Sequence, residues 1–176
     1  MEARATSQPK PPPELFFCQQ HDGIGNACGT IACMHAVSNA AAGGAFELSD
    51  GPLKRFMEAT NEGGPADRGR ALLQATELQE MSDATAAAGE TEGAGSDDAQ
   101  GQHFIAFVNF GGQLYELDGR NFSRDAEGAE AWPVFHGLTS PESFLLDAAK
   151  VVQEDFMARD PESVNFNLVA LSKCDE

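Results

Sequence analysis

Cys28 has a side chain and a position that suit nucleophilic chemistry. It follows the glycine-containing turn DGIGN and lies near the start of a helix predicted over residues 27–42. Unpaired N–H groups and the positive end of the dipole at a helix start favour a thiolate over a thiol. A thiolate at this position would attack a carbonyl carbon. A small apolar cysteine is also common in protein cores, so Cys28 alone leaves both interpretations open.

His103 and Asp118 lie on one predicted hairpin. Two runs rich in aromatic and aliphatic residues are joined by Gly111-Gly112, in the sequence HFIAFVNF-GG-QLYELDG. This dipeptide suits a two-residue turn, because such a turn needs φ > 0 at both positions. A symmetric turn places Ile105 opposite Asp118, and His103 on the same face, about 7–8 Å from Asp118 between Cα atoms.

Such a pair could assist a cysteine. An aspartate that accepts from one imidazole N–H fixes the tautomer of the histidine and leaves the other ring nitrogen free to serve a thiol. The residues therefore allow a site made of Cys28, His103 and Asp118, and they equally allow a chance polar pair on an edge hairpin. His35 is a poor base for Cys28, because two helical turns, about 10 Å, separate them. We expect His35 to be a buried structural histidine.

The elements that would position these residues can be predicted from local patterns. Helix signals cover residues 27–42, with Asn26 as the N-cap, and recur at 53–60, 66–82 and 140–161. Strand signals cover residues 15–18, both arms of the hairpin and residues 164–171. Helices followed by a hairpin, a helix and a strand predict an α+β fold.

Composition excludes several classes of function. The net charge of −17 disfavours nucleic acids and anionic membrane surfaces as partners. No apolar run approaches the roughly 18 residues of a membrane helix, and the N-terminus lacks the apolar core of a secretory signal. The cysteines form no CxxC pair and the histidines have no zinc-site spacing, so we expect no metal or other cofactor. Free thiols in the cytoplasm or nucleus, and a monomer, are the expectation.

Two stretches lack Leu, Ile, Val and Phe altogether, namely residues 1–14 and 83–103. We therefore predict a disordered Pro-rich lead-in over residues 1–14 and one globular domain over residues 15–176. Within the domain, residues 83–101 are predicted to form a flexible insertion, because they contain no large apolar side chain and no positive charge.

Three segments carry a resemblance to a known family: GIGNACGTIACMHAV (23–37), QHFIAFVNFGGQLYELDGR (102–120) and PVFHGLTSPESFLLDAAKVVQEDF (133–156). In this order they resemble the ubiquitin carboxyl-terminal hydrolases, which are papain-like cysteine proteases with an antiparallel sheet flanked by helices. The resemblance implies Cys28 as nucleophile, His103 as general base and Asp118 as the residue that orients it.

The same resemblance implies a reaction and a partner. The reaction is hydrolysis of amides or thioesters after the C-terminal glycine of ubiquitin, or of a ubiquitin-like protein, in ubiquitin-dependent protein catabolism. The insertion at residues 83–101 falls where the family has a crossover loop that limits which adducts can pass. Family members begin with a further strand and helices, which we expect to be missing here. A catalytically weak or inactive ubiquitin-binding remnant is therefore the alternative function.

The oxyanion-binding glutamine of the family precedes the nucleophile by six residues, where this sequence has Asp22. We predict that Gln20 takes this role instead, because a carboxylate would repel both the negative oxygen and the Cys28 thiolate. The extra residues, His21 and Asp22, would be absorbed in a bulged turn in which Gly23 permits φ > 0.

Overall fold

The computed structural model describes residues 10–88, 103–125, 128–131 and 133–172. A short 3₁₀ helix η1 (Asp22–Ile24) is followed by α1 (Cys28–Ala42), α2 (Pro52–Ala59), α3 (Pro65–Leu72) and α4 (Thr76–Ala88). The strands are β1 (Ala106–Phe110), β2 (Gln113–Leu117), β3 (Phe122–Asp125), β4 (Gly128–Ala131) and β5 (Val134–Leu138). Helix α5 (Phe144–Val151) continues through the π-helical turn η3 (Val152–Phe156) and the 3₁₀ turn η4 (Met157–Arg159).

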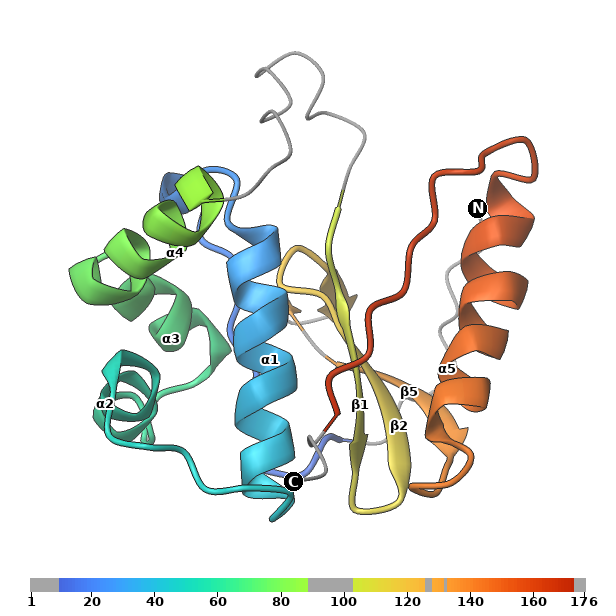
Figure 1. Ribbon diagram of the computed structural model, residues 1–176, viewed down its shortest axis with the longest axis horizontal. Helices are drawn as coiled ribbons and strands as arrows, with labels where there is room; N and C mark the ends of the chain where they lie inside the picture. The colour runs from blue at the N-terminus through green and yellow to red at the C-terminus, as the bar shows by residue number, and fades with distance from the viewer. Residues whose placement is uncertain (1–9, 89–102, 126–127, 132, 173–176) are drawn as a thin grey trace.

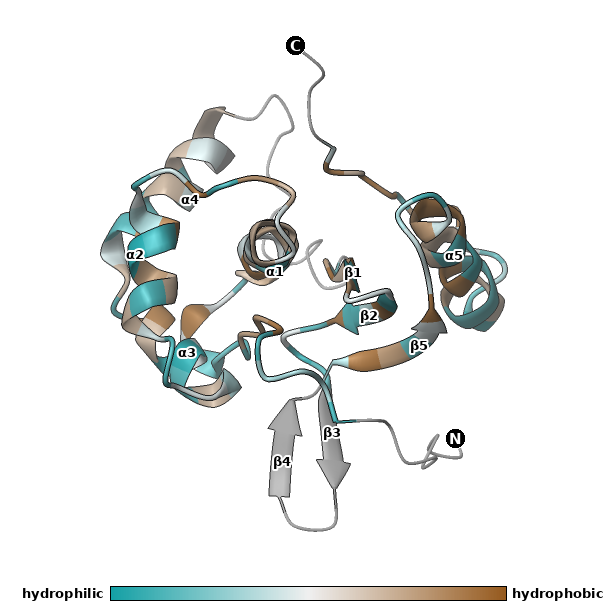
Figure 2. Cartoon of the chain, turned by 90° about the horizontal axis from the view of Figure 1, so that it is seen from below, coloured by the Kyte–Doolittle hydropathy of each residue, from teal (hydrophilic) through white to brown (hydrophobic). Residues whose placement is uncertain are grey.

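Helix α1 occupies the middle of the molecule. Helices α2, α3 and α4 pack on one side of it and the sheet lies on the other, with α5 beyond the sheet (Figures 1 and 2). Strands β1, β2 and β5 form an antiparallel sheet in that order, and β3 pairs with β4. The predicted α+β class is confirmed.

The β1–β2 hairpin has the predicted register. Ala106 pairs with Leu117, and Phe110 pairs with Gln113. The two turn glycines have φ of 59° and 77°, which only glycine adopts without strain. With this register, residues near the two open ends of the hairpin lie on one face of it, as predicted for His103 and Asp118.

The helix predicted over residues 66–82 is two helices. The carbonyls of Leu72 and Leu73 end α3 and accept from the side-chain amide of Gln79, which lies in α4 (2.9 and 3.2 Å). Helix α4 then runs to Ala88, so residues 83–88 of the predicted flexible insertion are helical. This stretch is rich in alanine, the best helix former. The remainder of the insertion, and residues 1–9 of the predicted lead-in, lie outside the described residues.

Residues 15–20 run extended between two apolar cores but join no strand of the described sheets, so the strand predicted at 15–18 is wrong. Leu15 and Phe17 face β1 and β2, whereas Phe16 and Cys18 face α1 and the helices beyond it. Their backbone groups bond to side chains instead of a neighbouring strand, as described below for the site.

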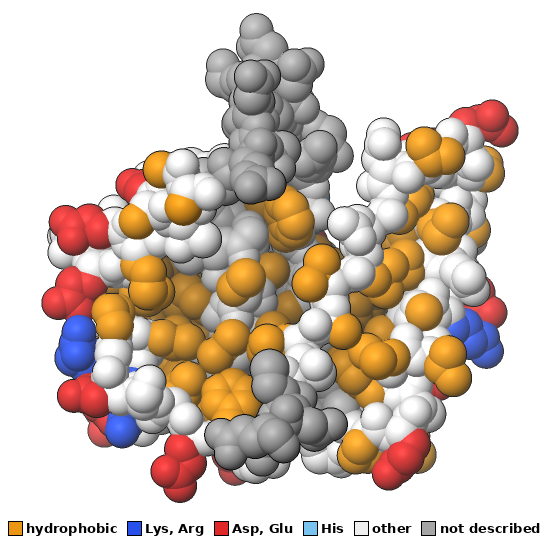
Figure 3. All heavy atoms as spheres, in the orientation of Figure 1, with side chains coloured by type: hydrophobic (Ala, Val, Ile, Leu, Met, Phe, Trp, Pro, Cys, Tyr) orange, Lys and Arg blue, Asp and Glu red, His pale blue; other side chains and the backbone are white. Residues whose placement is uncertain are grey.

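The strand predicted at residues 164–171 is also wrong. This stretch is extended but pairs with no described strand, and Val164 and Val169 are each 90% exposed. An alternating pattern supplies strand propensity, but a ladder forms only where a neighbouring strand supplies the hydrogen-bond partners. Leu145 and Leu146 of α5 are exposed as well. Hydrophobic side chains are visible over α5 and this segment in Figure 3, which has the orientation of Figure 1.

Gly69 sets how closely α3 approaches the extended segment. A Cβ atom at this position would lie 2.2 Å from the carbonyl oxygen of Gln19. We expect Gly69→Ala to lower the free energy of unfolding by about 1–3 kcal/mol, since backbone must move to admit the methyl group. Urea denaturation measures this. Gly29→Ala is the matched control, because its Cβ would meet only Phe104, at 3.7 Å; equal stabilities of the two variants would contradict the prediction.

Candidate active site

Cys28 is the first residue of α1 and is 4% exposed. Ala27, not the predicted Asn26, occupies the N-cap position, and no side chain caps this helix. The side chain of Asn26 is used elsewhere: its Oδ1 accepts from the Cys28 thiol (3.4 Å) and from Nη2 of Arg120 (3.3 Å). The first backbone N–H groups of α1 have no partner within the helix, and Cys28 stands at this end of it.

His103 and Asp118 form a hydrogen-bonded pair at the open end of the hairpin. Nε2 of His103 lies 2.7 Å from Oδ1 of Asp118, and the two side chains are 32% and 17% exposed. The same Oδ1 accepts from the backbone N–H of Arg120 (2.8 Å). The contact leaves Nδ1 of His103 as the nitrogen that can serve another group.

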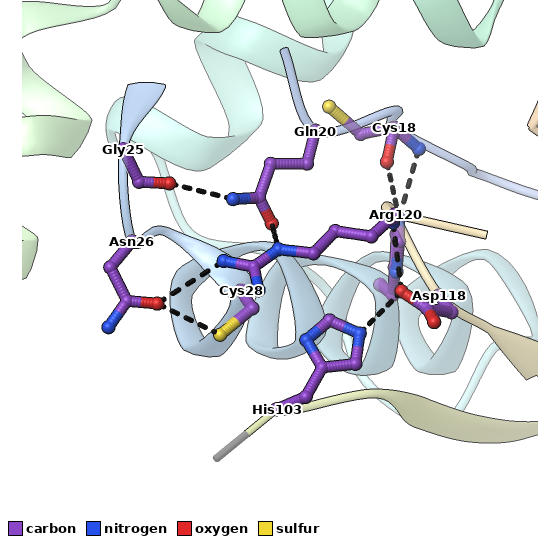
Figure 4. A network of polar contacts seen from close by, with 9 residues as sticks. Cys18, Gln20, Gly25, Asn26, Cys28, His103, Asp118 and Arg120 are labelled. Carbon is purple, nitrogen blue, oxygen red and sulfur yellow. Dashed lines mark hydrogen bonds and ion pairs between the residues drawn. The ribbon is translucent and has the colours of Figure 1, made fainter. Parts of the chain in front are cut away.

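The His103–Asp118 pair and Cys28 meet at the start of α1 (Figure 4). Their chain neighbours confirm the proximity, because the ring of Phe104 lies 3.7 Å from the position of a Cβ on Gly29. None of the hydrogen bonds between described residues joins the Cys28 thiol to the His103 ring. The thiol is instead directed to Asn26.

Gln20 lies in the same site and is 7% exposed. Its Nε2 donates to the carbonyl oxygen of Gly25 (2.7 Å), and its Oε1 accepts from Nε of Arg120 (3.0 Å). One of its two amide hydrogens is therefore committed to Gly25, and the other remains available.

Asp22 lies in η1 and is exposed. The turn that absorbs the extra residues is thus a 3₁₀ turn, in which Nδ1 of His21 accepts from the backbone N–H of Gly23 (3.1 Å). Its left-handed residue is Gly25, with φ of 72°, and not the predicted Gly23. Gly25 is the C-cap of η1 and lies two residues before Ala27, the N-cap of α1.

The other thiols differ from Cys28 in their surroundings. Burial raises the pKa of Cys18 to about 12, which keeps it protonated. Cys33 lies on α1 and is exposed, and all three of these cysteines are free. Cys174 lies outside the described residues. Among Cys18, Cys28 and Cys33, only Cys28 lies at the start of a helix.

His35 is fully buried, as expected of a structural histidine. Its Nε2 accepts from the backbone N–H of Cys18 (2.9 Å), and its ring stacks on Phe17 with 5.0 Å between centroids. Asn39, one turn further along α1, binds both the N–H and the carbonyl of Phe16 (2.8 and 2.9 Å). Side chains of α1 thus replace a neighbouring strand for residues 16–18.

Sequence reasoning missed two groups. Arg120 ends the motif LYELDGR, but its partners Gln20 and Asn26 are about a hundred residues away in the chain, so no local pattern could reveal them. The second is His136 of β5, which bonds to Glu116 (2.7 Å) and lies 3.8 Å from Asp155, joining the sheet to η3. Neither pattern is visible without the fold.

Two further findings concern the described residues only. No helix among them is long and apolar enough to cross a membrane. No group of three or more His, Cys, Asp or Glu side chains among them is arranged to hold a metal ion.

Residues 1–158 match the sequence model of the family described as ubiquitin carboxyl-terminal hydrolase, family 1. The chain belongs to this family. It is 42% identical over 161 residues to a ubiquitin carboxyl-terminal hydrolase of Drosophila melanogaster, covering 92% of this chain and 64% of that protein. It is 37% identical to ubiquitin carboxyl-terminal hydrolase 3 of Arabidopsis thaliana, covering 91% and 62%.

A human relative, ubiquitin carboxyl-terminal hydrolase isozyme L1, is 40% identical, with 92% of this chain and 65% of the relative covered. The chain thus spans slightly less than two thirds of the length of each of these relatives. The resemblance that the motifs around Cys28 and Asp118 indicated is confirmed by these matches.

The buried imidazole of His35 makes stability depend on pH. Burial lowers the pKa of His35 from 6.5 to about 4. Its contribution to stability is therefore fully present above pH 6.5 and is lost as the pH falls towards 4, because the unfolded chain takes up the proton first. We expect a slope of up to about 1.4 kcal/mol per pH unit in this window.

Urea denaturation of the wild type and of His35→Gln between pH 7 and pH 5 measures this effect. The variant should be less stable at pH 7 but should lose less stability on acidification, because glutamine does not titrate. Equal slopes in the two proteins would contradict the prediction.

Proposed function

We propose that this chain is a cysteine-type deubiquitinating hydrolase, which cleaves amide or thioester adducts from the C-terminal glycine of ubiquitin or a ubiquitin-like protein. The observation that carries the proposal is the His103–Asp118 pair at 2.7 Å, held beside Cys28 at the start of α1. The names of the relatives supply the substrate class. A role in ubiquitin-dependent protein catabolism, in the cytoplasm or nucleus, follows from that substrate.

The acid–base chemistry requires the Cys28 thiol to leave Asn26. The Cys28 thiol turns from Asn26 towards His103 and gives its proton to Nδ1, while Asp118 stabilises the imidazolium through Nε2–H. The thiolate then attacks the carbonyl carbon of the C-terminal glycine. Catalytic hydrogen bonds are often long or absent before substrate binds, so the resting contact of the thiol with Asn26 is compatible with this step.

The tetrahedral intermediate carries a negative oxygen that needs donors. Backbone N–H groups at the start of α1 and the free amide hydrogen of Gln20 are the groups in place to supply them. His103 then protonates the leaving amine or thiol, and the acyl-enzyme forms. Water, deprotonated by His103, finally releases ubiquitin and restores the Cys28 thiol.

The acidic charge of the chain, −17, favours a basic partner and fits the basic C-terminal tail of ubiquitin. By the resemblance, the crossover loop that limits the size of the leaving group falls on residues 83–101, of which residues 83–88 form the end of α4. Helix α4 is tied to the first turn of α1 by a hydrogen bond between Ser82 and Thr30 (2.7 Å).

Cys28 should be the only thiol that reacts with ubiquitin carrying a C-terminal vinyl sulfone. Intact-mass spectrometry should find one adduct in the wild type, none in Cys28→Ala, and one in the matched control Cys33→Ser, which removes an exposed thiol from the same helix. An adduct that survives Cys28→Ala would show that another group is the nucleophile.

Wild-type protein that binds unmodified ubiquitin but forms no adduct would favour the alternative, a ubiquitin-binding protein without hydrolase chemistry. Calorimetric titration with ubiquitin distinguishes this outcome from failure to bind at all, which would contradict the proposed substrate.

Gln20, and not Asp22, should supply the side-chain oxyanion donor. We expect Gln20→Ala to lower kcat on a ubiquitin C-terminal fluorogenic amide by about 10²-fold, the usual effect of losing such a donor. Asp22→Ala should change kcat little, because Asp22 is exposed in η1. A silent Gln20→Ala combined with a faster Asp22→Ala would mean that Asp22 lies at the oxyanion in the working enzyme.

A further inference from the structure

A guanidinium bridges the turn that separates Gln20 from Cys28. Nε of Arg120 donates to Oε1 of Gln20 (3.0 Å), and Nη2 donates to Oδ1 of Asn26 (3.3 Å). The backbone N–H of Arg120 also donates to Oδ1 of Asp118 (2.8 Å). Figure 4 shows this arginine reaching from the segment of Asp118 to both sides of the turn.

We propose that Arg120 is a positioning residue that holds the Gln20 amide in the orientation required of an oxyanion donor. The proposal rests on the proposed function. Arg120 acts through Gln20 and Asn26 and not by contact with the reacting atoms.

The orientation of the amide follows from its two partners. Arg120 presents only donors, so it requires the oxygen of the Gln20 amide on its side. Gly25 presents a carbonyl oxygen and requires the nitrogen. A rotated amide would place donor against donor and oxygen against oxygen, and both contacts would be lost. The guanidinium and the carbonyl therefore select the same rotamer, with one N–H left free.

The position of Arg120 is fixed by a close backbone contact. The backbone N–H of Gln20 donates to the carbonyl of Gly119 (2.8 Å), and a Cβ on Gly119 would lie 3.2 Å from both that nitrogen and the carbonyl oxygen of Cys18. Glycine permits this approach, so the side chain of Arg120 starts directly beside the turn that it bridges.

Lysine could not replace this arginine. A planar guanidinium donates from Nε and Nη2 in two fixed directions, whereas an ammonium is a single point of charge on a flexible stem. Arg120→Lys keeps the positive charge near the thiol but loses the geometry that holds Gln20 and Asn26 together. Charge and geometry can therefore be separated by one conservative substitution.

The kinetic test uses the ubiquitin fluorogenic amide with Arg120→Ala, Arg120→Lys, Gln20→Ala and the Arg120→Ala/Gln20→Ala double variant. We expect Arg120→Ala to lower kcat about tenfold with KM within about twofold, and Arg120→Lys to recover little of the loss. In the Gln20→Ala background, Arg120→Ala should cost less than about twofold further, because Gln20 is then absent. Arg55→Ala is the matched control, because this arginine lies on α2 and pairs with Glu77 of α4 and not with any of the four residues Cys28, His103, Asp118 and Gln20.

Two kinetic outcomes would overturn the proposal. A raised KM with an unchanged kcat would mean that Arg120 contacts ubiquitin itself. Fully additive losses in the double variant would mean that Arg120 and Gln20 act independently.

A second measurement does not depend on catalysis. In ¹H–¹⁵N spectra of the free protein, the side-chain amide signals of Gln20, assigned by their loss in Gln20→Ala, should move towards those of solvated glutamines in Arg120→Ala and stay in place in Arg55→Ala. Unchanged signals in Arg120→Ala overturn the positioning itself. A wild type without turnover and without the Cys28 adduct overturns instead the proposed function.

Discussion

The backbone of residues 15–20 crosses the molecule between two apolar cores, and the rest of the structure depends on how its polar groups are satisfied. Alternate side chains face the sheet on one side and the helices on the other, so water reaches neither face. Buried N–H and C=O groups without partners are costly, and no described strand lies beside this segment to supply them. Asn39 and His35, one turn apart on α1, take the place of that strand. This arrangement ties the central helix to the extended segment and makes a neutral imidazole at His35 a requirement of the fold.

The same crossing determines where the site lies. Because α1 begins at Cys28 and the extended segment ends at Gln20, the turn between them is short and must contain a left-handed residue, Gly25. The bond from Gln20 to Gly119 then brings the end of the hairpin to this turn. The same bond brings His103, which precedes β1, and Arg120, which follows Asp118, to the turn. The site therefore combines three segments: the end of the extended segment, the start of α1 and the open end of the hairpin.

The Cys28 thiol and the His103 ring have separate hydrogen-bond partners in the structure. The Cys28 thiol is directed to Asn26, while His103 is held by Asp118. Within the proposed function, only the first of these contacts must break before the thiol can give its proton to His103, and a thiol hydrogen bond is weak.

The sequence alone determined what local rules govern. The Gly111-Gly112 turn set the hairpin register, and that register placed His103 beside Asp118, because side chains alternate with a fixed period of two. The glycines on either side and the spacing of apolar residues between them predicted the bounds of α1 to within one residue. Tertiary structure decided what depends on distant partners. The side chain of Gln79 bonds to the carbonyls at the end of α3, where the sequence predicted one continuous helix. The strands predicted at residues 15–18 and 164–171 pair with no described strand, because strand propensity alone supplies no ladder partner. Tertiary structure also decided the role of Arg120, whose partners lie about a hundred residues away and are brought to it only by the close approach of two backbones at Gly119.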